Sequence, residues 1–165
     1  METMKIILMS DTHGLCDKKM EKYLADCDEI WHAGDIGSLE VVNKLRSFAP
    51  LRAVYGNIDD QNIRHEFSEF LSFDCEGVSV LMTHIGGFPG KYDAKAIRQI
   101  FATKPKIFVC GHSHILRVMY DKHFDMLTLN PGAVGQQGFH QTRTMLRFEI
   151  SEGEIKNMEV IEFPR

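Results

Sequence analysis

Five short polar clusters, each just after a predicted strand, carry the side chains of this sequence that could do chemistry. In chain order, they are Asp11-Thr12-His13, Gly34-Asp35, Gly56-Asn57, Thr83-His84 and Gly111-His112-Ser113-His114. Carboxylate, amide and imidazole ligands of this kind suit Mn, Fe, Zn or Ni rather than calcium or a metal that prefers thiolates. Such a ligand set matches a two-metal site for the hydrolysis of phosphate esters, in which a carboxylate bridges two ions about 3.5–4 Å apart.

Each cluster alone is weak evidence, because Asp, Asn and Gly after a strand are ordinary turn residues. The two histidines that flank Ser113 form the most specific of the clusters. The joint pattern is stronger, since ligands of open α/β sheets bind at the carboxyl ends of strands. Clusters this far apart in sequence can form one site only in the folded chain, so we expect their loops to meet.

The elements that must position the clusters alternate between strand and helix in the first third of the chain. Apolar patterns predict strands over 6–9, 29–32 and 51–55 and helices over 18–25 and 39–48, with Ser38 as an N-cap. Strand–helix–strand units of this length favour parallel pairing, with the helices packed on the sheet.

The rest of the chain is predicted to be richer in strands. A hairpin over 67–82, a helix over 93–102 and a strand over 107–110 are followed by strands over 115–120, 125–130, 143–150 and 154–162. We interpret the four C-terminal strands as a meander. The predicted fold class is therefore α/β, with two packed sheets and helices outside them.

Length and composition narrow the class of protein. A chain of 165 residues is predicted to fold as one domain over 1–165. Its formal charge of 19 − 23 = −4 gives no reason to expect specific nucleic-acid binding. The four cysteines form no C-x-x-C pair and are interpreted as free thiols of a reducing cytosol. The apolar run 5–9 is too short for a signal peptide or a membrane span, so we expect a cytoplasmic protein without a membrane partner.

In these five clusters, the sequence resembles the calcineurin-like metallophosphoesterases, in particular their small single-domain bacterial and archaeal phosphodiesterase branch. The resemblance runs from Lys5 to about Ile150 and includes the signature-like Asn130-Pro131-Gly132. It implies a four-layer αββα sandwich of two mixed β-sheets flanked by helices. It also implies that Asp35 bridges two metal ions. The implied ligands of one ion are Asp11, His13, Asp35 and His114, and those of the other are Asp35, Asn57, His84 and His112.

The leading hypothesis is a metal-dependent phosphodiesterase with two divalent ions, of which Mn is the first expectation and Fe, Ni and Zn are alternatives. The nucleophile is expected to be water or hydroxide bound between the ions, with catalytic contributions from Asp35, Asn57 and His112. The expected substrate is a small phosphate ester. Two alternatives stay open, namely a phosphomonoesterase with the same site and a protein-binding scaffold like the retromer subunit of this fold. Small members of the family commonly form homodimers or homotetramers, and the sequence leaves both states open here.

Two departures from the family pattern affect the expected chemistry. Larger members carry, directly after Gly-Asn, a histidine that protonates the leaving oxygen, but here that position is Ile58. General-acid help is worth about 10²–10⁴-fold in rate, so we expect a modest rate or a preference for good leaving groups. The small branch usually continues Thr-His-Gly-His, whereas Ile85 follows His84 in this chain. That change affects substrate preference more than metal binding.

Three further residues have two interpretations each. Asp59 either orients a ligand or a water, or is only a turn residue. His32 either packs at the end of its strand or forms a hydrogen bond behind the ligands. Arg143, in the loop 136–143, either contacts a phosphate through its guanidinium fork or has a structural role, and the structural role is the one that we expect.

Overall fold

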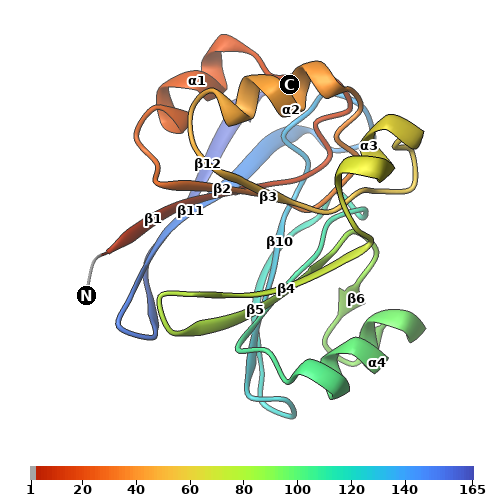
Figure 1. The fold of residues 1–165 in the computed structure, drawn as a ribbon, viewed down its shortest axis with the longest axis vertical. Helices are drawn as coiled ribbons and strands as arrows, with labels where there is room; N and C mark the ends of the chain where they lie inside the picture. Colours follow the sequence, from red (N-terminus) through yellow and green to blue (C-terminus); the bar gives the residue numbers. More distant parts are fainter. Residues whose placement is uncertain (1–2) are drawn as a thin grey trace.

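Two five-stranded mixed sheets pack face to face, and helices cover their outer faces (Figure 1). The computed structural model describes residues 3–165, so residues 1 and 2 of the predicted 1–165 domain lie outside it. Buried apolar side chains form one cluster between the sheets and one between each sheet and its helices. This arrangement confirms the predicted α/β class and the four-layer αββα sandwich.

The first sheet contains the first three strands of the chain and the last two. Its order is β12 (Glu154–Pro164), β11 (Thr142–Ser151), β1 (Met4–Met9), β2 (Glu29–His32) and β3 (Leu51–Ala53). β1, β2 and β3 are parallel, as predicted, whereas β11 runs antiparallel to β1. Side chains alternate along a strand, so Leu8 packs between the sheets and Ile7 packs against the helices.

Helices α1 (Lys18–Leu24) and α2 (Leu39–Arg46) cover the outer face of the first sheet. The side chain of Ser38 accepts a hydrogen bond from the N–H of Val41 at 3.4 Å, which confirms Ser38 as the N-cap of α2. The apolar stripe of α2 is buried against the sheet. The helix ends at Arg46 rather than at the predicted residue 48.

The second sheet has the order β4 (Phe70–Cys75), β5 (Val78–Thr83), β8 (Ile107–Val109), β10 (Met126–Pro131) and β9 (Leu116–Asp121). β4 and β5 form the predicted hairpin, and β8 pairs in parallel with both β5 and β10. On its outer face, α4 (Ala94–Thr103) packs Ile100 into a cluster with Phe108. No helix within residues 3–165 is both long enough and apolar enough to cross a membrane.

The predicted C-terminal meander is wrong. β9 and β10 pair with each other in the second sheet, but β11 and β12 belong to the first sheet. The reason is visible in β11, where the adjacent residues Met145 and Leu146 are both buried and pack into different clusters. A strand that is apolar on both faces needs cover on both faces, and in the first sheet β11 has the second sheet over one face and the cluster on the helix side over the other.

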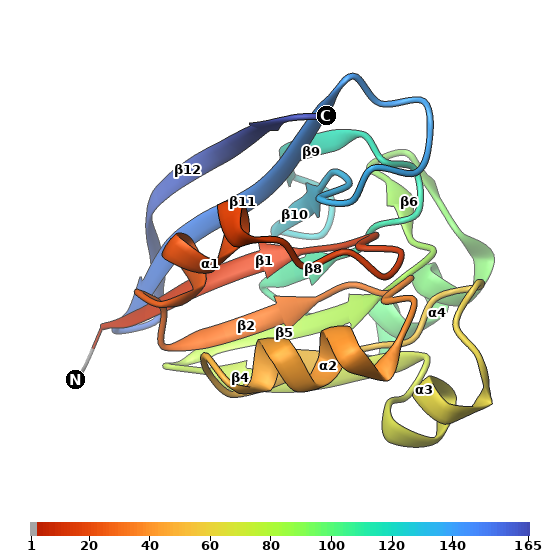
Figure 2. The ribbon, with the colours of Figure 1, turned by 90° about the horizontal axis from the view of Figure 1, so that it is seen from above.

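The sequence patterns did not indicate three short elements, which are α3 (Gln61–Glu66), β6 (Gly87–Phe88) and β7 (Lys91–Tyr92). α3 buries only Ile63, so it lacks the apolar stripe that periodicity detects. Its local signal is Asp60, whose side chain caps the helix by accepting from the Ile63 N–H at 3.2 Å. Figure 2 shows α3 and β6 on the side of the molecule toward which β1, β2 and β5 point.

Candidate metal centre

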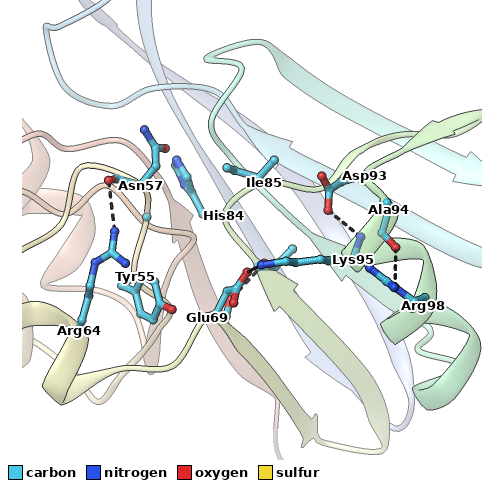
Figure 3. Close-up of a pocket in the computed structure, with 12 residues that line it drawn as sticks. Tyr55, Asn57, Arg64, Glu69, His84, Ile85, Asp93, Ala94, Lys95 and Arg98 are labelled. Carbon is cyan, nitrogen blue, oxygen red and sulfur yellow. Dashed lines mark hydrogen bonds and ion pairs between the residues drawn. The ribbon is translucent and has the colours of Figure 1, made fainter.

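The five polar clusters meet at one edge of the molecule, because each follows the carboxyl end of a strand. Asp11 follows β1, Asp35 follows β2, Asn57 follows β3, His84 follows β5 and His112 follows β8. Backbone hydrogen bonds join neighbouring loops, since Asp11 N–H donates to the Gly34 carbonyl and Gly111 N–H to the His84 carbonyl, both at 2.9 Å. A cavity of about 590 Å³ opens beside Asn57 and His84 (Figure 3).

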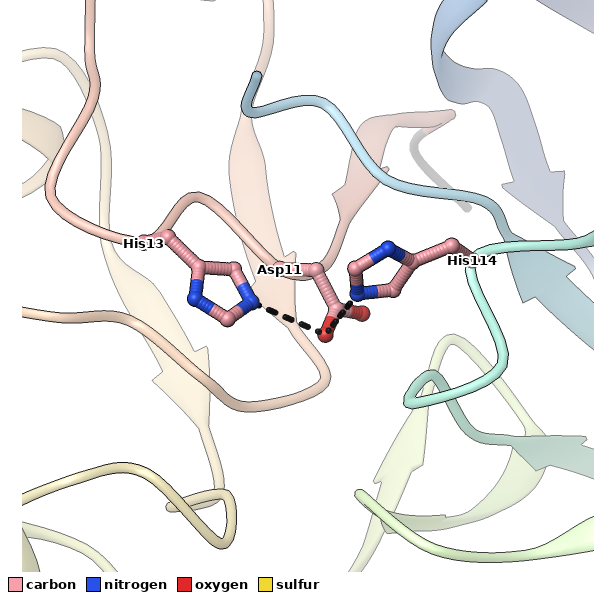
Figure 4. A group of neighbouring side chains, drawn as sticks. All are labelled: Asp11, His13 and His114. Carbon is pink, nitrogen blue, oxygen red and sulfur yellow. Dashed lines mark hydrogen bonds and ion pairs between the residues drawn. The ribbon is translucent and has the colours of Figure 1, made fainter. Parts of the chain in front are cut away.

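Asp11, His13 and His114 form the first group of potential metal ligands (Figure 4). One ligand atom from each side chain lies within 4.8 Å of the others. The Nε2 atom of His114 lies 3.1 Å from Oδ1 of Asp11, and the Nε2 atom of His13 lies 3.6 Å from the same oxygen. The loops after β1 and β8 thus direct three side chains to one point.

Asp35, His84 and His112 form the second group, again with one ligand atom each within 4.8 Å of the others. The Nε2 atom of His84 lies 3.1 Å from Oδ2 of Asp35. Asn57 lies beside this group, with its amide oxygen 3.1 Å from Nδ1 of His112. The structure therefore brings together all the side chains that the sequence pattern singled out as ligands.

Asp35 lies at the junction of the two groups. Its Oδ2 is 3.1 Å from Nε2 of His84 and 3.6 Å from Nε2 of His13, which belong to different groups. Its Oδ1 accepts a hydrogen bond from the Ile58 N–H at 3.1 Å, which holds the carboxylate in this orientation. A Cβ atom on Gly56 would overlap Oδ1 of Asp35, so only glycine fits at that position. A carboxylate that bridges two ions would need this placement.

The side chains fit a metal ion, because hydrogen bonding leaves two of their atoms unsatisfied. Nε2 of His13 and Nε2 of His84 are buried and make no hydrogen bond of acceptable geometry, although carboxylate oxygens lie 3.1–3.6 Å away. Buried polar atoms in native proteins nearly always have a bonding partner, so the lack of one at these two nitrogens indicates a site for a bound ion. Ligand atoms about 2.1 Å from an ion lie roughly 3.0–3.4 Å from one another, similar to the spacing here.

Hydrogen bonds behind the ligands fix the orientation of the side chains. The Nδ1–H of His84 donates to the Ala33 carbonyl at 2.8 Å, so the lone pair of Nε2 faces the carboxylates. Outer bonds of this kind set the tautomer of a metal-binding imidazole. Asp11 Oδ2 accepts from Ser10 Oγ at 2.6 Å and from the His112 N–H at 3.2 Å, which leaves Oδ1 to face the histidines.

His32 also lies behind the ligands and forms hydrogen bonds there. Its Nδ1 accepts from the Gly34 N–H at 3.1 Å, so its Nε2–H donates to Thr12 Oγ1 at 3.0 Å. Burial lowers the pKa of His32 to about 4, in keeping with a neutral ring. Thr12 donates in turn to the Ile36 carbonyl at 2.7 Å. This chain of bonds links the loops after β1 and β2.

Asp59 joins two ligand-bearing loops and is more than a turn residue. Its buried carboxylate accepts hydrogen bonds from the N–H groups of Ile36 at 3.1 Å, Gly37 at 2.9 Å and Gly56 at 2.8 Å. The first two donors belong to the loop after β2, and the third belongs to the loop after β3. Asp59 therefore sets the distance between two loops that carry predicted ligands.

Most of the predicted ligands have a left-handed backbone conformation. The φ angles are 56° at Asp11, 46° at His13, 56° at Asp35, 70° at His112 and 63° at His114. Positive φ is uncommon for residues other than glycine and costs roughly 1–3 kcal/mol where the surroundings impose it. Strain of this kind concentrates at functional sites, and here it accompanies the convergence of the side chains.

The charges of the site shift the pKa values of its members. Burial raises the pKa of Asp11, but the hydrogen bond from His114 and the nearby imidazole of His13 outweigh burial and hold that pKa well below its usual range. The carboxylate of Asp11, whose Oδ1 lies 3.6 Å from Nε2 of His13, raises the pKa of that histidine. Burial lowers the pKa of His84, but Asp35 and Asp11 together raise it above its ordinary value. Because imidazole must lose its proton to bind a metal, ion binding would release protons here.

The structure places Arg143 in a structural role. Its side chain is buried, its Nε donates to the Val134 carbonyl at 2.6 Å, and its Nη1 pairs with Asp17 at 3.0 Å. Neither partner is a predicted ligand. These contacts favour the structural interpretation of Arg143 over a phosphate contact.

Residues outside the five clusters also shape the site. Asn130, from the signature-like motif, donates from Nδ2 to the Gly111 carbonyl and to Ser113 Oγ, both at 3.1 Å, and so supports the loop of the paired histidines. The sequence analysis did not single out Arg64 and Arg98, which line the cavity beside the ligands. Arg64 lies on α3, for which the cap residue before the helix was the available signal.

Comparison with known proteins places the chain in a family. It matches the calcineurin-like phosphoesterase superfamily domain over residues 4–153. A "Probable metallophosphoesterase" of Methanocaldococcus jannaschii is 30% identical over 138 residues, which cover 79% of this chain and 68% of that protein. An archaeal phosphodiesterase of known structure superposes with a TM-score of 0.72 at 24% identity, covering 96% of this chain and 100% of the other. Vps29 of Entamoeba histolytica in complex with Zn²⁺ superposes with a TM-score of 0.75 at 16% identity, covering 98% and 99%. The two structures share the fold, and the sequence match shows that this chain belongs to the calcineurin-like phosphoesterase superfamily.

Proposed function

We propose that this protein is a metal-dependent phosphodiesterase with a dinuclear metal centre. The observation that carries the proposal is the pair of ligand groups joined at Asp35, where buried Nε2 atoms of His13 and His84 lie near carboxylates without hydrogen bonds. Family membership supports the hydrolysis of a phosphate ester. In this proposal, one ion is held by Asp11, His13, Asp35 and His114, and the other by Asp35, Asn57, His84 and His112.

The proposed chemistry divides between the ions and the side chains. Divalent ions supply, when bound, a hydroxide nucleophile at neutral pH and positive charge for the phosphoryl oxygens. Asp35 sets the spacing of the two ligand groups, and the exposed imidazole of His112 can donate a hydrogen bond to a phosphoryl oxygen as charge develops there. Ile58 cannot give a proton, so the leaving oxygen takes its proton from water.

Two cavities flank the segment after β5, and their arrangement supports a diester. The larger, of about 590 Å³, is lined by Asn57 and His84, and the smaller, of about 260 Å³, is lined by His112 and Ser113. Ile85 lines both cavities. A phosphate held at the ligand groups thus has space on two sides. A diester has two ester groups to place in that space, whereas a monoester has one.

The proposal is tested by hydrolysis of bis(p-nitrophenyl) phosphate beside p-nitrophenyl phosphate. The protein is stripped of metal with a chelator, and Mn, Ni, Zn or Mg is added back in turn, with Mn expected to give the highest rate. We expect metal-dependent cleavage of the diester with little cleavage of the monoester. A preference for the monoester would instead identify a phosphatase that uses the same site.

A protein-binding scaffold is the second candidate function, and one surface favours it. The edge strand β9 exposes Val118 and Tyr120 on one face, where these residues are 43% and 55% exposed, and Met119, which is 42% exposed, on the other. Neighbouring exposed apolar side chains are typical of protein-binding surfaces. Absence of hydrolysis with any metal, in a protein that binds two ions per chain, would make the scaffold the better conclusion.

A further inference from the structure

The smaller cavity, beside His112, is lined by exposed apolar side chains from three segments of the chain. Ile85 lies in the segment after β5, Phe88 lies on β6, and Ile115 directly precedes β9. These residues are 42%, 38% and 55% exposed. Single exposed apolar side chains are ordinary, but three that line one cavity indicate a site for an apolar group. The volume of about 260 Å³ is sufficient for one six-membered ring, since a cavity of about 150 Å³ can bind benzene.

Arg117 adds a cation to the same wall and stacks on Phe88. Its guanidinium carbon lies 4.2 Å from the centroid of the Phe88 ring, and both side chains line the cavity. Within residues 3–165, the guanidinium of Arg117 forms no ion pair with a carboxylate and no hydrogen bond. Guanidinium groups stack on aromatic rings and are attracted by the negative face of the ring. An aromatic ring therefore suits this wall better than an alkyl chain, which gains nothing from the cation.

The backbone places this wall next to the loop of His112. Arg117 on β9 is paired in register with Asn130 on β10. The Nδ2 of Asn130 donates to the Gly111 carbonyl and to Ser113 Oγ, the two residues that flank His112, both at 3.1 Å. His112 itself lines the cavity together with Arg117. A group bound in the cavity therefore lies beside the second group of predicted metal ligands.

The lack of a proton donor at Ile58 points to the same kind of ester group. Ile58 directly follows Asn57 and cannot protonate the leaving oxygen. A phenol, with a pKa of about 10 like that of tyrosine, leaves with little help from an acid. An aryl ester thus fits both the wall of the cavity and the absence of a proton donor.

We propose that the smaller cavity binds the aromatic ring of an aryl ester group, against the stacked side chains of Phe88 and Arg117. The inference rests on the proposed function and narrows its substrate class to aryl phosphodiesters. Hydrolysis adds the oxygen of water to phosphorus and breaks the P–O bond to the phenol. One proton of that water ends on the phenol oxygen, and the other ends on the product phosphate or in the solvent.

The test compares two ligands that differ only in the aromaticity of one ring. Benzylphosphonate resembles an aryl phosphate in which a CH₂ group replaces the ester oxygen, and cyclohexylmethylphosphonate has a ring of similar size without π electrons. Neither is hydrolysed, so isothermal titration of the metal-loaded protein measures binding alone. We expect benzylphosphonate to bind at least about 5-fold more tightly, because aromatic and cation–π contacts add to the burial of apolar area. Equal dissociation constants for the two ligands overturn the inference.

Substitutions assign the preference to the two stacked side chains. We expect the ratio of the two dissociation constants to fall to near 1 in Phe88→Ala and to be retained in Phe88→Tyr. Arg117→Gln should lower the ratio in part, because it removes the cation and keeps Phe88. The ratio cancels any change at the metal centre, which both ligands share. The matched control is Phe101→Ala, an aromatic residue of α4 that is 61% exposed and lines a different cavity. A wild-type ratio in Phe88→Ala overturns the inference.

The binding measurement separates failure of this inference from failure of the proposed function. Tighter binding of benzylphosphonate, lost in Phe88→Ala, supports the aromatic subsite even if no ester is cleaved, in which case the proposed function fails alone. Equal binding of the two phosphonates, beside efficient metal-dependent hydrolysis of bis(p-nitrophenyl) phosphate, means that the aromatic subsite fails alone.

Discussion

The Nδ1 atom of His84 lies 2.8 Å from the carbonyl oxygen of Ala33, and this hydrogen bond joins the two sheets at the candidate site. Ala33 follows β2 in the first sheet, and His84 follows β5 in the second. The next residue, Gly34, has a φ angle of 104°, and a Cβ atom there would lie 2.7 Å from Nδ1 of His84. The position of the imidazole is therefore determined by the backbone of another sheet.

Gly34→Ala is expected to displace His84 and weaken metal binding. Loss of an outer hydrogen bond to a ligand typically costs about 10–100-fold in metal affinity, and we expect a loss in that range by competition with a fluorescent chelator. Gly90→Ala is the matched control, because Gly90 also has a positive φ of 88° but has nothing within 4 Å of the added Cβ. Equal losses of affinity in both variants would show that backbone strain, not contact with His84, is responsible.

Asp35→Asn is expected to weaken binding at both ligand groups and to reduce diester hydrolysis nearly to background. Asparagine keeps the shape and can still accept from the Ile58 N–H, but it removes the negative charge shared between His13 and His84. Metal content per chain, measured by mass spectrometry after dialysis, checks the prediction together with the rate. Asp74→Asn, an exposed position on β4, is the control. Normal turnover and full metal content in Asp35→Asn would falsify the bridging role.

Stability of the metal-free protein is expected to depend on pH through three histidines. The carboxylate of Asp11 beside His13, and the carboxylates that outweigh burial at His84, raise the pKa values of both histidines above the ordinary 6.5. The stability that these two groups contribute is present below pH 6.5 and is lost as pH rises through their raised pKa values. Burial lowers the pKa of His32 to about 4, so its contribution is present above pH 6.5 and is lost as pH falls toward 4.

Together, these shifts predict that the metal-free protein has its highest melting temperature near pH 6.5. Thermal unfolding in excess chelator, followed by circular dichroism from pH 4.5 to 9, provides the measurement. Saturating metal ions should reverse the decline on the alkaline side, because ions bind the deprotonated imidazoles of the folded state. A melting temperature that keeps rising from pH 6.5 to 9 without metal would contradict the role given to His13 and His84.

Ile58→His is expected to restore a proton donor next to Asn57. The side chain of Ile58 is 47% exposed, so a histidine fits there without rearrangement of the core. General-acid catalysis is worth about 10²–10⁴-fold for a poor leaving group, and we expect an increase of at least about 10-fold for an alkyl ester. For p-nitrophenyl esters, whose leaving group needs little protonation, the rate should change little. Ile58→Gln controls for polarity, and an equal gain in that variant would exclude proton donation.

The ligands of the candidate site were predictable because short-range signals place them at strand ends. Asp11, Asp35 and His84 each end a buried apolar run, and parallel pairing brings such ends to one edge. The pairing of the strands was less predictable. The pattern of apolar residues shows that β11 is buried, but it does not show which strand lies beside it. This is why the C-terminal meander was wrong.

The walls of the larger cavity were beyond prediction for a different reason. Arg64 and Arg98 lie on separate helices, and their approach to Asn57 and His84 depends on how those helices pack rather than on any local pattern. Charged side chains on short or half-exposed helices are most often solvated, so their types give no signal of a site. The hydrogen bonds of Asp59 could not be predicted from the sequence either, because its three N–H donors lie in two different loops.

The backbone is left-handed at five of the predicted ligands, although none of them is glycine, the residue that adopts this conformation most easily. They are Asp11, His13, Asp35, His112 and His114. At each position, glycine would adopt the same φ angle without steric strain, so the backbone conformation alone does not favour the side chain that is present. Five strained positions gathered at one site are therefore hard to account for by stability alone, and they fit a site that is used for chemistry.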